Sequence, residues 1–84
     1  MKAKTIMVEE EAYICIQKEV ARRRNIVFNE KREDYLRRSF REVHSSWKMA
    51  IADFTFSIPI VELKKLLDEN NLPYEDSEME CMML

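Results

Sequence analysis

The feature that most constrains the fold of this 84-residue chain is a single strand pattern at its start, followed by helical patterns. Residues 4–8 (KTIMV) predict a short strand with one buried face, because the β-branched residues Ile6 and Val8 are spaced by two. Ile6 and Val8 take the inward positions. A lone strand is not stable and must pair with another. The same strand of a second copy meets that need, so we expect a homodimer in which the two strands pair.

A first amphipathic helix is expected from about residue 9 to residue 24. Ala12, Ile16 and Val20 recur at steps of four and form one apolar stripe. Glutamates precede this stripe and arginines follow it, and both placements suit the helix dipole. The chain contains no glycine, so Asn25 is the residue expected to take the left-handed C-cap conformation.

The second helix is expected to be long. Asn29 is a good N-cap, and the pattern predicts a helix from about Glu30 to Asp53. Its apolar stripe has heptad spacing and consists of Leu36, Phe40, Val43, Trp47, Ala50 and Phe54. The first helix is too short to cover this face, which needs a third helix or a partner chain. The predicted dimer or partner interface comprises Ile6, Val8, Leu36, Phe40, Val43, Trp47 and Phe54.

The rest of the chain is expected to form a linker, a short helix and a tail. Residues 54–60 alternate with period two, but Pro59 favours an extended linker over a strand. Three leucines before Pro73 predict a third helix; they are Leu63, Leu66 and Leu67. The predicted fold class is mainly α: an N-terminal strand, two helices and a short C-terminal helix. The predicted divisions are a core over 1–54, a linker and helix over 55–73, and a flexible acidic tail over 74–84.

Charge divides the chain into a basic front and an acidic end. Residues 1–48 carry a balance of +4 and residues 49–84 a balance of −6, within a net charge of −2. Halves of opposite charge often have different partners. The alternative is that the acidic end is only a solvated surface.

Catalysis is not expected. His44 is the only histidine and has no nucleophile or acid at helical spacing. Cys15 and Cys81 lack metal-ligand spacing, and a chain without glycine has no glycine-rich phosphate loop. We therefore expect no enzymatic activity, no metal and no cofactor.

No apolar run approaches the roughly 20 residues of a membrane span, so we expect a cytoplasmic protein. Residues 81–84 (CMML) match a prenylation box, but the acidic residues before them disfavour contact with anionic lipid.

The first half of the chain carries a family pattern. Ile6 and Val8 match inward strand positions, and the stripe of the first helix matches a core stripe. Asn25 stands near a customary glycine, and residues 27–30 (VFNE) match the start of a second helix. Over about residues 2–42 the chain therefore resembles the ribbon-helix-helix family of Arc-type repressors and antitoxins.

The resemblance implies a DNA-binding site. In that family two strands form a ribbon in the major groove, and the N-termini of the second helices contact phosphates. The positions carried over are Lys2 and Lys4 for phosphates, Thr5 and Met7 for base edges, and Phe28 and Asn29 for backbone phosphate contacts. Met7 offers only apolar contact, such as to a thymine methyl group. The implied function is a small homodimeric DNA-binding transcriptional regulator.

Family antitoxins place toxin-binding segments after the DNA-binding half, which implies a second site here. Its candidate docking residues are Phe56, Ile60, Leu63, Leu66, Leu67 and Tyr74. The alternative is that the third helix folds back onto its own chain. A rival function is a small helical inhibitor or adaptor of phage type, which binds a host protein through the aromatic long helix and the acidic tail.

Overall fold

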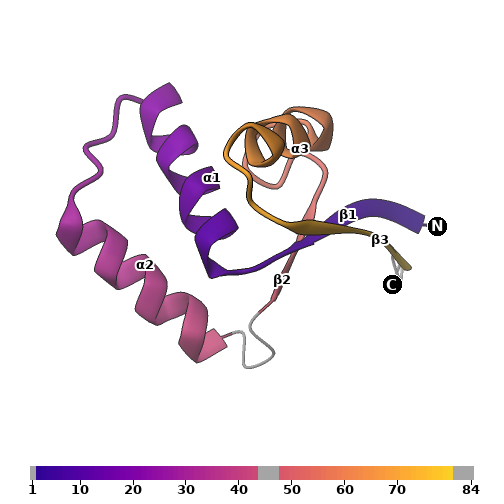
Figure 1. Ribbon diagram of the computed structural model, residues 1–84, viewed down its shortest axis with the longest axis horizontal. Coiled ribbons are helices and arrows are strands. Elements are labelled where there is room, and N and C mark those ends of the chain that lie inside the picture. Colours follow the sequence, from indigo (N-terminus) through magenta and orange to yellow (C-terminus); the bar gives the residue numbers. More distant parts are fainter. Residues whose placement is uncertain (1, 44–47, 81–84) are drawn as a thin grey trace.

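The computed structural model describes residues 2–43 and 48–80 as three helices and three strands (Figure 1). In chain order they are β1 (Lys2–Val8), α1 (Glu10–Arg23), α2 (Glu30–Val43), β2 (Met49–Ala52), α3 (Ile60–Glu69) and β3 (Tyr74–Glu80). More of these residues lie in helices than in strands. The fold is therefore mixed α/β and mostly helical, with an antiparallel sheet that the sequence analysis did not predict.

Strand β1 lies in the middle of this sheet, between β2 and β3. Both neighbours run antiparallel to it: Ile6 faces Ile51 of β2 on one side and Asp76 of β3 on the other. The expected pairing of this strand with a second copy is wrong, because both edges of β1 are already occupied by the same chain. A homodimer formed by another surface stays a prediction.

The main core lies between one face of the sheet and helices α1 and α3. Ile6, Val8 and Ile51 supply the sheet side and have no exposed surface. The helix side consists of Ala12, Ile16, Val20, Ile60, Leu63 and Leu67. Each fully buried aliphatic side chain of this kind stabilises the fold by about 1.5–3 kcal/mol. The inward strand positions Ile6 and Val8 and the stripe of the first helix are thus core positions, as the spacing of two and the four-residue steps indicate.

Helix α2 ends at Val43, and the prediction that it continues to about Asp53 is wrong. Residues 49–52 form β2 instead, which pairs with β1 and buries Ile51 completely. The heptad stripe passes through these residues, but strand pairing and burial of Ile51 outweigh helical periodicity there. Trp47 lies outside the described residues.

Strand β3 replaces most of the expected flexible tail. Tyr74–Glu80 pairs with β1 along seven positions, from Val8–Tyr74 to Lys2–Glu80. The expectation of a frayed segment is wrong here, because β1 needs a partner on this edge and Tyr74 packs against the core. Glu75 and Asp76 are exposed, and charged side chains of this kind are compatible with an edge strand. Residues 81–84 lie outside the described part of the chain.

Two asparagines end helices in place of glycine. Asn25 and Asn71 both have φ of 55°, in the left-handed region. The next N–H in each case reaches back to close the helix: Ile26 donates to Ala21 O at 2.8 Å, and Leu72 donates to Leu67 O at 2.9 Å. These are Schellman-type ends. The left-handed conformation predicted for Asn25 is therefore confirmed, and it directly follows the C-cap residue Arg24.

Candidate functional site

The predicted DNA-contacting residues do not form one surface. Thr5 is buried, with 4% of its surface exposed, and its hydroxyl has no hydrogen-bond partner among the described residues. Met7 is half-buried beside Ala50, whereas Lys4 is exposed. The side chain of Lys2 is outside the described set. Because β1 is an internal strand, Thr5 is not presented to a DNA base as the ribbon model requires.

The two remaining DNA candidates lie at the start of α2. The Oδ1 atom of Asn29 accepts a hydrogen bond from the Arg32 backbone N–H at 2.9 Å, so Asn29 is the predicted N-cap. The ring of Phe28 is half-buried, and the Lys18 ammonium lies 5.8 Å from its centroid. This end of α2 and the start of β1 lie at opposite ends of the molecule in Figure 1.

Most predicted interface and docking residues are internal. Leu36 and Phe40 are buried, and the Phe40 ring lies 5.3 Å from that of Tyr13 in α1. Val43 and Phe54 are exposed, at 70% and 61%. The docking candidates Ile60, Leu63 and Leu67 are buried core residues, while Phe56, Leu66 and Tyr74 are half-buried against that core. The third helix therefore packs on its own chain, which was the alternative to a free docking segment.

Charged side chains clamp α2 to α1. Arg37 bonds to Glu10 at 2.8 Å and Glu11 at 2.6 Å, and also to Glu33 of its own helix at 3.2 Å. Arg41 adds a second bond to Glu10 at 2.7 Å. Hydrogen bonds first from Arg41 and then from Arg37 lower the pKa of Glu10, against an opposing effect of burial. The acidic start of α1 thus serves the contact between the two helices.

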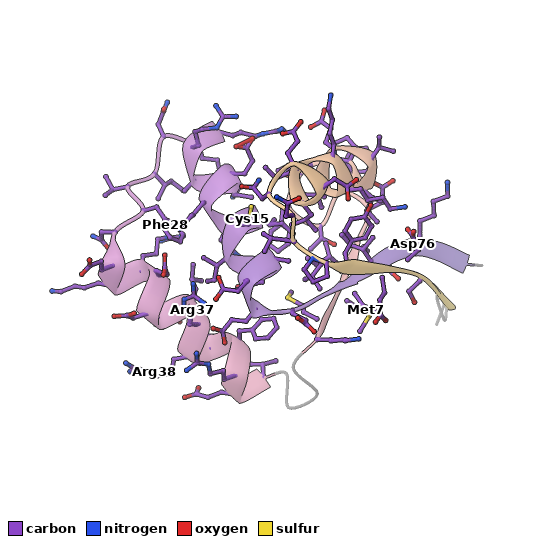
Figure 2. All side chains as sticks on the ribbon, in the orientation of Figure 1. Met7, Cys15, Phe28, Arg37, Arg38 and Asp76 are labelled. Atoms are coloured by element: carbon purple, nitrogen blue, oxygen red, sulfur yellow. The ribbon has the colours of Figure 1, made fainter. Side chains whose placement is uncertain are left out.

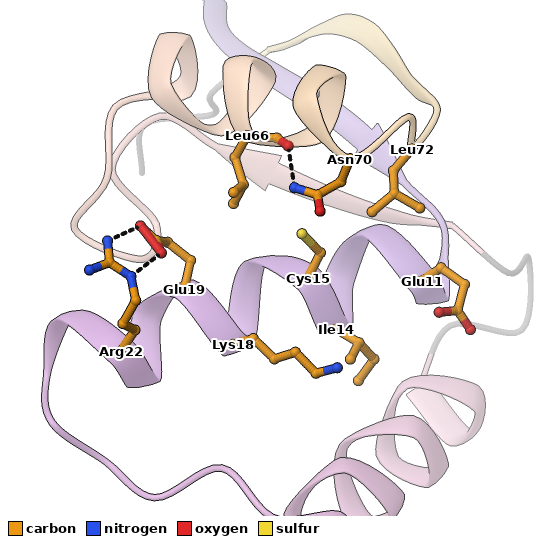
Figure 3. Close-up of a pocket in the computed structure, with 9 residues that line it drawn as sticks. All are labelled: Glu11, Ile14, Cys15, Lys18, Glu19, Arg22, Leu66, Asn70 and Leu72. Carbon is orange, nitrogen blue, oxygen red and sulfur yellow. Dashed lines mark hydrogen bonds and ion pairs between the residues drawn. The ribbon is translucent and has the colours of Figure 1, made fainter.

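A shallow hollow of about 410 Å³ runs along the exposed side of α1 beside α3 (Figure 3). We call it the α1–α3 groove. The residues that line it are Glu11, Ile14, Cys15, Lys18, Glu19, Arg22, Leu66, Asn70 and Leu72. Four of them recur along α1 at steps of four, three and four, and so share one helix face: Glu11, Cys15, Lys18 and Arg22. The groove exists because α1 uses its other faces for the core and for α2.

The middle of the groove is apolar and its rim is charged. Cys15 points towards α3 in Figure 3, and Cys15, Leu66 and Leu72 are all half-buried. On the rim, Arg22 bonds to Glu19 at 2.7 Å. Hydrogen bonds from Arg22 and then Arg23 lower the pKa of Glu19 to about 2, although its partial burial acts in the opposite direction. Glu19 is therefore a fixed anion at neutral pH.

The groove offers binding contacts and no arrangement typical of catalysis. Burial raises the pKa of the Cys15 thiol, more than Lys18 lowers it, so the thiol is protonated and weakly nucleophilic at neutral pH. In the described ranges 2–43 and 48–80, no cluster of three or more His, Cys, Asp or Glu side chains is arranged to hold a metal ion. The sequence analysis did not predict this groove. The residues on its α1 side recur at helical spacing, but the position of α3 beside them depends on tertiary packing, which no local pattern reveals.

The arginines fall into two groups. Arg22, Arg23, Arg37 and Arg41 all bond to glutamates. Arg24, Arg32 and Arg38 are exposed, as is Lys31, and their side chains form no ion pair within the described residues. Figure 2 shows Arg37 turned towards α1 and Arg38 turned away from it. The second group places four cations on the α1–α2 connection and on α2, beside the exposed carboxylates of Glu30, Asp34 and Glu42.

Comparison of the chain with protein-family models, with curated proteins and with solved structures found no match. Within the part of the chain that the structure describes, no helix has the length and apolar character needed to cross a membrane.

Proposed function

We propose that this protein is a small protein-binding module, of the inhibitor or adaptor class, and that its partner docks in the α1–α3 groove. The observation that carries the proposal is the pairing of a half-buried apolar strip with a charged rim in this groove. Ion-paired arginines and the contact of buried Phe40 with half-buried Tyr13 already hold α2 in place. The exposed side of α1 is therefore open to a partner without any change in the fold.

The chemistry of the groove suits a segment with one or two apolar anchors. Its volume of about 410 Å³ lies within the range of pockets that accept compact groups. Cys15, Leu66 and Leu72 supply apolar contact. Lys18 and Glu11, with 55% and 66% of their side chains exposed, lie at the rim in ion pairs with Glu33 and Arg37 of α2. Interfaces of this type depend on a few central anchors inside a polar rim.

A matched pair of substitutions on α3 tests the proposal. Leu66→Lys places a charge in the groove, whereas Val61→Lys places the same charge at a position that is 76% exposed and outside the groove. Affinity capture from a lysate of the source cells should recover one main protein with the wild type and with Val61→Lys. Recovery should fall about tenfold or more with Leu66→Lys, as expected for loss of a central anchor.

Circular dichroism provides the folding control for this experiment. Val61→Lys should melt close to the wild type, whereas Leu66→Lys should melt several degrees lower because half-buried Leu66 packs against the core, so capture is measured below both melting transitions. Equal recovery of the partner by Leu66→Lys and Val61→Lys, with both proteins folded, would show that the groove is not the docking surface.

DNA binding is the second candidate function, and the unpaired basic side chains of the α1–α2 region favour it. We propose that any contact with duplex DNA is made by Arg24, Lys31, Arg32 and Arg38 rather than by β1. Four phosphate contacts give an affinity that falls with the logarithm of salt concentration with a slope of about −3 to −4. Glu30, Asp34 and Glu42 are exposed on the same helix and reduce the local positive charge.

Fluorescence anisotropy with a labelled duplex at low salt tests this second candidate. Replacing both Arg32 and Arg38 by Ala should weaken binding and make the salt slope shallower by about two. Replacing Arg22, which is bonded to Glu19, should change the slope much less. Absence of binding by the wild type at low salt would remove DNA from the list of partners.

A further inference from the structure

We infer that the outer edge of β3 accepts an extended, basic segment of a partner protein, which adds to the sheet as a fourth strand. This surface is distinct from the α1–α3 groove, and the inference does not depend on the function proposed for that groove. Peptides that extend a sheet in this way gain affinity from backbone hydrogen bonds and specificity from side chains.

The hydrogen-bond pattern of the sheet identifies the open backbone groups. Asp53 N–H donates to Lys4 O at 3.3 Å, which extends the β1–β2 ladder by one position. Lys4 and Ile6 therefore direct their backbone groups towards β2. In an antiparallel sheet these groups alternate between the two sides of a strand, so Thr5 and Met7 bond to β3.

The same alternation applies to β3. Ser77 and Glu75 face Thr5 and Met7 and direct their N–H and C=O groups inward. The intervening residues direct theirs towards the outer edge; they are Tyr74, Asp76, Glu78 and Glu80. In the described part of the chain no strand pairs with this edge, since β3 is the last strand of the sheet. A row of unpaired backbone groups of this length is a template for another strand.

Charge selects the kind of strand that fits. The segment Tyr74–Glu80 contains Glu75, Asp76, Glu78 and Glu80 and no lysine or arginine. The chain already places its own lysines against this strand: Lys64 of α3 pairs with Asp76, and the Lys48 ammonium lies 2.5 Å from Glu75. A basic strand would supply the same complement along the outer edge. A second copy of β3 would instead bring like charges opposite one another, which is destabilising.

The probe for this edge is a synthetic peptide, acetyl-KVKVKVK-amide, whose alternating pattern suits a strand. Titration into the ¹⁵N-labelled protein should perturb the amide signals of Asp76 and Glu78 and protect them from hydrogen exchange. A control peptide of the same sequence, N-methylated at every second residue on its pairing side, keeps the charge and loses the backbone donors. It should bind about tenfold or more weakly, because several hydrogen bonds are lost.

Glu78→Pro and Glu78→Gln separate backbone pairing from charge. Proline removes an outward N–H and is tolerated on an edge strand, so the affinity for the peptide should fall about tenfold while the protein stays folded. Glutamine keeps the N–H, and the affinity should fall only a few-fold. Equal binding of the N-methylated and unmodified peptides would overturn the inference, even if the proline variant fails to fold. Self-association of the wild type through β3, displaced by the peptide, would also overturn it and assign the edge to a second copy.

Discussion

At the scale of single residues, the chain forms its helix ends and turns without glycine. Asn25 and Asn71 take left-handed conformations that asparagine tolerates. Phe54 and Ser57 also have positive φ, of 64° and 61°, in the turn between β2 and α3. Such a conformation costs of order 1 kcal/mol or more for a residue that has a Cβ and whose side chain cannot form a hydrogen bond with the nearby backbone. The position of Phe54 is unusual, because its large side chain is 61% exposed and buries little surface in return.

Replacing Phe54 by Gly should therefore stabilise the fold by about 1 kcal/mol, because glycine adopts positive φ without a penalty. The measurement is urea denaturation followed by circular dichroism. Phe56→Gly is the control: this neighbour lacks a positive φ, packs against the core, and should lose about 2 kcal/mol or more when truncated. A clear loss of stability in Phe54→Gly would contradict the conformation of this turn.

At the scale of elements, α1 is the organising helix, because it packs on the sheet with one face and on α2 with another. The contact with α2 relies on Arg37, whose side chain is only 21% exposed and touches three glutamates. Glu10 and Glu33 have lowered pKa values, caused mainly by Arg41 for Glu10 and by Lys18 for Glu33, with Arg37 contributing to both. The acidic N-terminus of α1 suits the helix dipole, but most of its charge is used in this interhelical contact.

The lowered pKa values give stability a defined pH dependence. Glu10 and Glu33 titrate at lower pH in the folded than in the unfolded chain, where the pKa lies near 4.5. Their contribution is fully present above about pH 5 and is lost as the pH falls through the lowered pKa values.

The adjacent residues Arg37 and Arg38 provide a matched test of that pH dependence. Arg37→Met should lower stability at pH 7 by about 1 kcal/mol and flatten its dependence on pH between about 5 and 3. Arg38→Met should change neither, because Arg38 has no ion pair among the described residues. Thermal melts at several pH values check both. The same pH profile for the two variants would contradict the ionic contact between α1 and α2.

The sequence predicts those elements whose pattern is local. The steps of four in Ala12, Ile16 and Val20 define α1, and the leucines of α3 define the third helix. It misassigns residues 49–52, because Ala50 belongs to a stripe of helical spacing while the same segment forms a strand that buries Ile51, and only the edge of β1 decides between helix and strand. It likewise misses β3, whose acidic residues resemble a solvated tail until β1 offers a partner. The α1–α3 groove depends on how two distant helices pack, which no local pattern contains.

At the scale of the whole molecule, the N-terminal strand is completed within one chain, and this changes what the basic front and the acidic end can do. The acidic end forms an edge of the sheet, and the basic residues divide between paired and unpaired positions on α1 and α2. A sheet that needs no second copy leaves the surface open to other partners. The pairing of β1 within one chain differs from the pairing between two chains that the ribbon-helix-helix resemblance implies.

Removing residues 74–84 should destroy the fold. Without β3, one edge of β1 is unpaired and the core loses the cover that Tyr74 contributes. We expect loss of the cooperative thermal transition, or self-association through the exposed edge of β1. Analytical ultracentrifugation and circular dichroism distinguish these results from the wild type. A truncated protein that is monomeric and melts at the wild-type temperature would show that β3 is dispensable.

The most direct test of the intrachain sheet is an isotope-filtered nuclear Overhauser experiment on a sample that mixes labelled and unlabelled chains. The register places Ile6 opposite Asp76, and Met7 opposite Ala50, as pairs without mutual hydrogen bonds, whose Hα atoms lie close together. The account predicts strong Hα–Hα signals for both pairs within labelled chains and none of them between chains. Signals between β1 of one chain and β1 of another, in place of these, would contradict it and restore the paired ribbon.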